Sequence, residues 1–221
     1  MEQEELILKD ENSGNYIKDT NPYQKYEDKT IQNDVIRFYL QYAHLKNLYR
    51  QGWLKNLIGM EHKEKCESVA DHSWSLALLA ISIIEKYELD YNISKCMKLA
   101  IIHELGEIYA GDYTPNEQIT SEQKHQLEKK AIQRMLGQID FKNDFLQLWE
   151  EFEQKKTKEA IFMKELDQLE FLMQSTVYEL DVSYLKTSRK KITLPVLQEI
   201  VDELIRITEG KQIPKDAVGK K

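Results

Sequence analysis

The 221-residue chain has few of the residues that interrupt helices or cross-link small folds. It contains only four prolines and eight glycines, a scarcity that favours long helices with few tight turns. Its two cysteines, Cys66 and Cys96, are too few for a disulfide framework and form no CxxC zinc pair. We therefore expect a reducing compartment, with the cytoplasm as the predicted location.

Long apolar runs and basic blocks are also missing. The longest apolar stretch, residues 76–84, contains Ser82 and is too short to span a bilayer, and residues 1–14 lack the apolar centre of a signal peptide. The net charge is −7, and no cluster of Lys and Arg marks a nucleic-acid groove. We expect neither a membrane nor a nucleic-acid partner, and an anionic substrate would need a metal ion or an arginine.

The apolar periodicity predicts an all-α fold, a single helical bundle of about six to seven helices. Thr30 is a candidate cap for the first helix, Thr120 and Gln123 fit a capping box, and Pro195 suits a first helical turn. An apolar stripe that includes Val35 and Ile36 is expected to face the core. The predicted helices cover residues 30–49, 68–87, 92–110, 120–136, 143–154, 157–178 and 194–208.

Composition divides the chain into one folded unit with two polar ends. Residues 1–28 are polar and are expected to form a flexible or loosely docked N-terminal extension. Residues 29–210 form the predicted domain, and residues 211–221 form a frayed tail. The helix over residues 68–87 is apolar almost all round, so it is predicted to be central and buried.

The helix predicted over residues 92–110 carries the densest chemistry. His103 and Glu107 are four residues apart and share a helix face, Glu104 lies on the flank, and Asp112 follows the helix end. Clustered carboxylates beside a histidine are costly unless a cation or hydrogen bonds compensate them.

Two further residues lie on other predicted helices. His72 is near the start of the most apolar helix, and Asp167 borders an apolar face in residues 157–178. Imidazoles and carboxylates from facing helices make a plausible mixed nitrogen and oxygen site for a divalent ion.

The order of these residues resembles that of the HD-domain phosphohydrolases, and within them the 5′-deoxynucleotidases. That family has a histidine, a later His-Asp pair and a distant aspartate. The resemblance covers residues 35–205 and includes Arg50-Gln51-Gly52-Trp53, Glu67-Ser68-Val69-Ala70-Asp71-His72, Glu107, Gly111-Asp112 and Lys164 to Asp167.

The resemblance implies one divalent ion (Mn, Co, Ni, Mg or Fe) held by His72, His103, Glu104 and Asp167. Glu104 stands where the family has Asp. Glu is a legitimate ligand, but it is longer by about 1.5 Å, whereas a metal site tolerates only about ±0.2 Å in its ligand distances. Glu104 must therefore fold back, displace the ion or not bind it.

The resemblance also implies hydrolysis of deoxyribonucleoside 5′-monophosphates, with Glu107, Asp112 and Arg50 as the catalytic residues. Substrate binding is expected from Arg50, Trp53, Asp112 and Thr114. Arg50 would clamp the phosphate, Glu107 would move a proton, Asp112 would bind the sugar 3′-hydroxyl or assist the leaving oxygen, and Trp53 would exclude a 2′-hydroxyl. A homodimer is expected from the resemblance and from general frequency.

Other interpretations stay open. The chain is alternatively a non-catalytic nucleotide or metal sensor, or a phosphohydrolase of triphosphates or of cyclic or modified nucleotides. His44, His62 and His125 are interpreted as ordinary surface or hydrogen-bonded histidines. The charged stretches 124–130 and 150–158 are interpreted as solvated helix faces.

Overall fold

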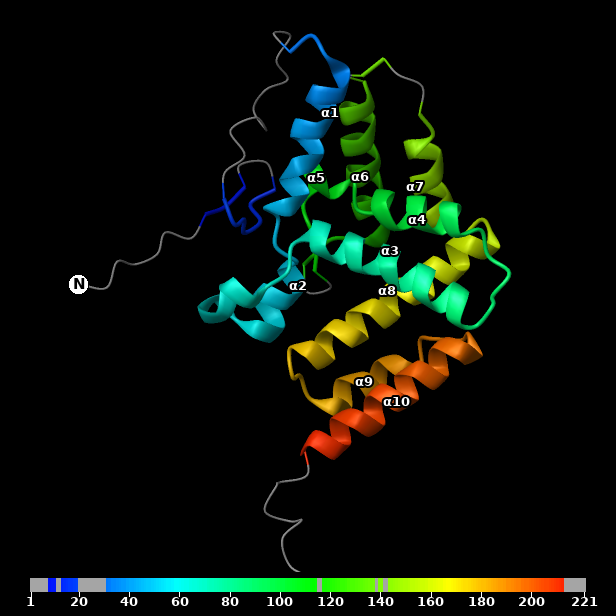
Figure 1. Cartoon of the computed structure of the whole chain (residues 1–221). Coiled ribbons are helices and arrows are strands. Elements are labelled where there is room, and N and C mark those ends of the chain that lie inside the picture. Colours follow the sequence, from blue (N-terminus) through cyan, green and yellow to red (C-terminus); the bar gives the residue numbers. More distant parts are fainter. Residues whose placement is uncertain are drawn as a thin grey trace, which may run out of the picture.

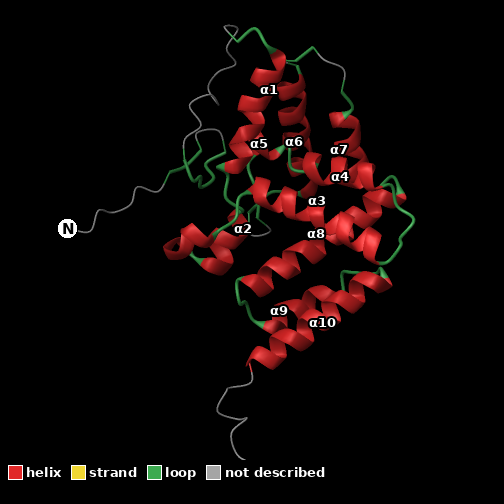
Figure 2. Cartoon of the chain, viewed as in Figure 1, coloured by secondary structure: helices red, strands yellow, loops and turns green. Residues whose placement is uncertain are grey.

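Every regular element that the computed structural model describes is a helix (Figure 2). The description covers residues 8–10, 13–19, 31–114, 117–137, 139–140 and 143–212, in which extended segments meet only at isolated bridges. The predicted all-α fold is confirmed. Within these ranges, none of the helices combines the length and the apolar character that a bilayer crossing requires.

The helices follow one another in a chain of short connections. Their bounds are α1 Asp34–Tyr42, η1 Ala43–Lys46, α2 Gln51–Trp53, η2 Leu54–Ile58, η3 Met60–Lys65, α3 Val69–Lys86, α4 Ile93–Ile102, α5 Glu107–Ala110, α6 Ser121–Leu136, α7 Phe145–Glu153, α8 Lys158–Val177, α9 Val182–Arg189 and α10 Pro195–Gln212.

Helix α3 lies in the middle of the molecule, against α4 and α8 (Figure 1). Leu76 of α3, Leu99 of α4 and Leu166 of α8 are buried in one apolar core. The prediction that α3 is central is confirmed. The prediction that it is buried all round is wrong, because Trp74 is 68% exposed and Leu78 is 49% exposed. An apolar sequence cannot say which face a helix turns toward its neighbours.

Local capping explains where several helices begin. Ser68 and Asp71 exchange bonds in a capping box at the start of α3, which places His72 within its first turns. The predicted capping box of Thr120 and Gln123 is present at α6, and Pro195 is the first residue of α10 as expected.

The first helix differs from its prediction. Asn33 caps α1, whereas Thr30 lies outside the described residues. Val35 and Ile36 are 65% and 52% exposed, so the predicted apolar stripe does not face the core as a whole. Helix α1 is followed at Ala43 by a tighter 3-10 turn, which rotates the later residues of the stripe away from a common line.

The predicted helix over residues 92–110 is broken. Helix α4 ends at Ile102, the chain turns through residues 103–106, and α5 begins at Glu107. Gly106 passes so close to Glu128 of α6 that an added Cβ would overlap it, so the turn depends on glycine. Helix α9 was not predicted, because its short polar sequence buries only Leu185 and Ser188.

The two ends of the chain are described in part. In the predicted N-terminal extension, Ile17 is buried and pairs with Leu48. Helix α10 continues beyond its predicted end to Gln212, and residues 213–221 lie outside the described residues.

Candidate metal and phosphate site

A cavity of about 270 Å³ opens between α2, α8, α9 and the chain that follows α5. It contains five of the residues that the sequence singled out and adds residues of α9 that it did not. The lining residues are Arg50, Gly52, Trp53, Asp112, Tyr113, Thr114, Asp167, Gln168, Phe171, Tyr184, Ser188 and Lys191.

Two buried histidines lie beside this cavity, one on α3 and one at the end of α4. His72 Nδ1 lies 2.6 Å from Glu170 Oε2, and His103 Nδ1 lies 2.8 Å from the Ala100 carbonyl oxygen. These acceptors favour the tautomers that carry the proton on Nδ1. The Nε2 atoms of both rings are buried and have no hydrogen-bond partner in the described part of the chain. In both rings Nε2 is therefore the nitrogen that could bind a cation once it carries no proton.

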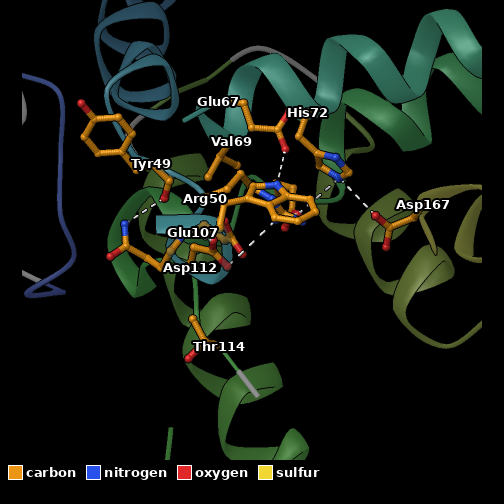
Figure 3. A network of polar contacts seen from close by, with 12 residues as sticks. Tyr49, Arg50, Glu67, Val69, His72, Glu107, Asp112, Thr114 and Asp167 are labelled. Atoms are coloured by element: carbon orange, nitrogen blue, oxygen red, sulfur yellow. Dashed lines mark hydrogen bonds and ion pairs between the residues drawn. The ribbon is translucent and has the colours of Figure 1, made fainter. Parts of the chain in front are cut away.

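Two carboxylates face these nitrogens. Asp167 Oδ1 lies 3.1 Å from His72 Nε2, and Glu104 Oε1 lies 3.3 Å from His103 Nε2 and 3.9 Å from His72 Nε2. Donor atoms of His72, His103 and Glu104 all lie within 4.8 Å of one another. The structure thus brings together the four residues that the sequence predicted as metal ligands, from α3, the α4–α5 turn and α8. Figure 3 shows two of them, His72 and Asp167, facing each other.

The charges of this cluster are strongly coupled. Burial disfavours the ionised form of Asp167, but its contact with His72 outweighs burial and holds the pKa of Asp167 below its ordinary value. Burial lowers the pKa of His72, yet Asp167 and Glu170 raise it to about 10. The raised pKa of His72 favours a protonated imidazole when no cation is bound, and a cation at Nε2 would displace that proton.

Arg50 lies next to the same carboxylates, at the N-terminus of α2. Its Nη1 donates to Glu104 Oε1 at 2.8 Å and lies 4.0 Å from Asp112 Oδ1. Asp112 is anchored by the Gln51 backbone N–H, which donates to its Oδ2 at 2.7 Å. The guanidinium is therefore held between Glu104 and Asp112 at the cavity wall.

Glu107 is the most isolated acid of the site. It is 1% exposed, and neither of its carboxylate oxygens has a hydrogen-bond partner within the described residues. Burial, together with the charges of Glu104 and Asp112, raises the pKa of Glu107 well above its ordinary value. The protonated form of Glu107 is therefore favoured relative to that of an exposed glutamate.

The prediction of a solvated face over residues 124–130 is wrong at Glu128, whereas Lys124 is partly exposed. Lys124 Nζ lies 3.2 Å from Glu128 Oε1 and 3.8 Å from Glu107 Oε1, and Glu128 is 5% exposed. Burial raises the pKa of Glu128 to about 7. The i, i+4 spacing of Lys124 and Glu128 was visible in the sequence, but it could not show that the packing of Gly106 against α6 buries Glu128.

Trp53 is buried at the cavity, and neighbouring side chains hold its indole ring in place. Its indole Nε1 donates to Glu67 Oε1 at 2.7 Å, and its ring stacks on Phe171 with centroids 4.2 Å apart. Thr114 is buried at the opposite wall, where its backbone N–H donates to Glu117. Among the partners that sequence reasoning missed, Glu170 follows Asp167 by one helical turn, a spacing that signals a shared face.

Residues 42–203 match the HD domain family, and the chain belongs to that family. Curated relatives include 5′-deoxynucleotidase HDDC2 of Dictyostelium discoideum, 34% identical over 155 residues, which cover 66% of this chain and 78% of the relative. The 5′-deoxynucleotidase hdd1 of Schizosaccharomyces pombe is 30% identical over 179 residues, covering 76% of this chain and 86% of the relative.

Solved structures share the fold. A conserved hypothetical protein from Pyrococcus furiosus aligns with a TM-score of 0.60 at 28% identity, covering 77% of this chain and 99% of that chain. A predicted metal-dependent phosphohydrolase from Magnetospirillum magnetotacticum aligns with a TM-score of 0.62 at 23% identity, covering 80% and 92%. The second likeness is evidence for the fold alone.

Proposed function

We propose that this chain is a metal-dependent phosphohydrolase that converts deoxyribonucleoside 5′-monophosphates to deoxynucleoside and phosphate. The observation that carries the proposal is the pair of unpartnered Nε2 atoms of His72 and His103, placed beside Glu104 and Arg50 at one cavity. Relatives that are 30–35% identical carry the name 5′-deoxynucleotidase, which supports the same substrate class.

The donor set fits a divalent cation. Two imidazole nitrogens and the carboxylates of Glu104 and Asp167 form a mixed nitrogen and oxygen set, which suits Mn, Co, Ni, Mg or Fe to differing degrees. A second group, Glu67, His72 and Glu170, is less suitable because Trp53 and His72 Nδ1 already bind those carboxylates. When bound, the cation lowers the pKa of a coordinated water and polarises the phosphoryl group.

Arg50 and Glu107 carry the remaining chemistry in this proposal. Arg50 leaves Glu104 and pairs with two phosphate oxygens, a geometry that suits its planar fork. Glu107 accepts the proton of the attacking water or returns one to the leaving 5′-oxygen, because its buried carboxyl group has no hydrogen-bond partner among the described residues and its pKa is raised above the ordinary value.

The sugar contacts the other predicted substrate-binding residues, which are Asp112, Thr114 and Trp53. Asp112 accepts a hydrogen bond from the 3′-hydroxyl or assists the leaving oxygen, and Thr114 lines the same wall. Trp53 is locked by Glu67 and Phe171, so it cannot move aside for a ribose 2′-hydroxyl. A polar group left without a partner is rejected more strongly than one that merely loses contact.

A nucleotide panel with each of the five divalent ions tests the proposal, and phosphate release is the measurement. Release from dAMP with little from AMP is the expected result, and His103→Ala is the inactive control. Binding of dAMP without turnover under any ion would support the sensor alternative. Turnover of triphosphates or cyclic nucleotides in preference to dAMP would change the substrate class.

We also propose that two copies of the chain associate. An apolar groove of about 650 Å³ between α1, α3 and α4 lies beside the exposed side chains of Trp74, Leu78 and Ile101. A face that offers both a groove and projecting apolar side chains can be self-complementary, as a two-fold dimer requires. A monomeric mass in solution would contradict this proposal.

The cytoplasmic location also remains a proposal, supported by the burial of both free cysteines.

A further inference from the structure

The chain that precedes the family domain packs against Gln51 and Gly111, the neighbours in sequence of the cavity-lining residues Arg50 and Asp112. We define residues 8–10 and 13–19 as the N-terminal strap. Asp10 Oδ1 accepts from the backbone N–H and the hydroxyl of Ser13, and Gly14 adopts a φ of +70°. Ile17 is 6% exposed and packs in the main core. The strap lies before residue 42, where the match to the HD domain family begins.

The first contact of the strap is with the residue after Arg50. Gln51 is fully buried, its Oε1 accepts from the Tyr16 backbone N–H at 3.0 Å, and its Nε2 donates to the Tyr16 carbonyl at 2.9 Å. Nε2 also donates to the Tyr49 carbonyl at 2.9 Å. The strap thus satisfies two hydrogen bonds of a buried side chain that would otherwise keep only its bond to Tyr49, with Oε1 buried and unpaired, which is costly.

The second contact is with the residue before Asp112. Gly111 adopts a φ of +85°, and a Cβ added there would overlap Asn15 Oδ1 and approach the Ser13 side chain. Asn15 is 6% exposed, and its Oδ1 has no hydrogen-bond partner among the described residues. The strap therefore packs directly against the turn that carries Asp112.

These two contacts are joined inside the site. The Gln51 backbone N–H donates to Asp112 Oδ2, so the strap, the start of α2 and the Gly111 turn form one hydrogen-bonded and packed unit. We propose that the strap is a positioning element of the active site, and that Gln51 and Asn15 set the location of Asp112 relative to Arg50. The inference rests on the proposed function and on the first of its two roles for Asp112, the hydrogen bond to the sugar 3′-hydroxyl.

A positioning role predicts a loss that depends on the sugar. Gln51→Ala removes both bonds to the strap but keeps the backbone N–H, and Asn15→Ala removes the support behind Gly111. We expect kcat/KM for dAMP to fall about tenfold or more, since about 1 Å of misplacement can cost roughly a hundredfold. Hydrolysis of p-nitrophenyl phosphate, which has no sugar, and the metal content should stay within about twofold of wild type.

The matched control is Lys18→Ala. Lys18 belongs to the strap, but its ammonium pairs at 3.3 Å with the exposed carboxylate of Asp71 and lies 5.6 Å from the Tyr49 ring centroid, so its side chain takes part in neither the Gln51 contact nor the Gly111 contact. This variant should keep both activities. If Gln51→Ala does not fold, as judged by circular dichroism, Asn15→Ala carries the test.

The outcomes separate the two proposals. The positioning role would be overturned if kcat/KM fell equally for dAMP and for p-nitrophenyl phosphate. It would also be overturned if Asn15→Ala and a folded Gln51→Ala both kept the wild-type kcat/KM for dAMP. A wild type without turnover on every nucleotide would overturn the proposed function. In that case calorimetric binding of dAMP replaces kcat/KM, and unchanged affinity in Gln51→Ala would refute the strap, whereas weakened affinity would support it.

Discussion

Glu104→Asp tests whether the longer side chain diverts Arg50 from its substrate. Glu104 Oε1 lies 2.8 Å from Arg50 Nη1, and both side chains are largely buried, at 11% and 16% exposure. Removing one methylene withdraws the carboxylate by about 1.5 Å from this partner. The family's usual aspartate would therefore leave Arg50 freer to bind phosphate.

The magnitude follows from Coulomb's law. At an effective dielectric constant of about 20, the attraction between the Arg50 guanidinium and the carboxylate at position 104 falls from about 6 to about 4 kcal/mol. The distance between the two charges grows in this step from 2.8 Å to about 4.3 Å. The difference of about 2 kcal/mol is at most about a thirtyfold change in affinity. We expect the wild type to be active but slow, and Glu104→Asp to raise kcat/KM for dAMP by up to that factor or to change the preferred metal.

The assay is hydrolysis of dAMP by wild type and Glu104→Asp with Mn, Co, Ni, Mg and Zn, together with inhibition by inorganic phosphate. Glu104→Gln is the control, because it frees Arg50 at unchanged length but weakens the metal site, so its metal content should fall. A wild type and an Asp variant with equal kcat/KM and equal phosphate inhibition would refute the reasoning. The sensor alternative predicts that the Asp variant stays inactive.

Four further outcomes are expected. His103→Ala should lose the metal and the activity with helicity largely intact, and metal analysis with circular dichroism checks this. Arg50→Lys should lose at least about tenfold in kcat/KM for dAMP, because Lys cannot form the two-pronged pairing. Lys124→Met should shift the acidic limb of the pH–rate profile upward, since Lys124 stabilises ionised Glu107. Burial raises the pKa of Glu67 from 4.5 to about 7, so stability present below pH 4.5 is lost as the pH rises through about 7. In metal-free protein this loss is at most about 3 kcal/mol, and urea unfolding of Glu67→Gln at pH 5 and pH 8 should show less of it than wild type.

Local patterns in the sequence determined much of the helical layout and the candidate ligand set. The capping box at Thr120 and the proline at position 195 mark helix starts by interactions within one turn, and both were confirmed. The ordered motif singled out His72, His103 and Asp167, which the structure brings together at one cluster. Such features were predictable because each depends on neighbours in the chain or on a recurring motif.

Tertiary packing decided the rest. The break after Ile102 depends on the close approach of Gly106 to Glu128, which lies on another helix. The same approach buries Glu128, which lies in a polar stretch that predicts a solvated helix face. The support of Asp112 by Gln51 and of Gln51 by the strap joins residues far apart in the chain. Burial and long-range partners set these charges and contacts, and neither is encoded in any short stretch of sequence.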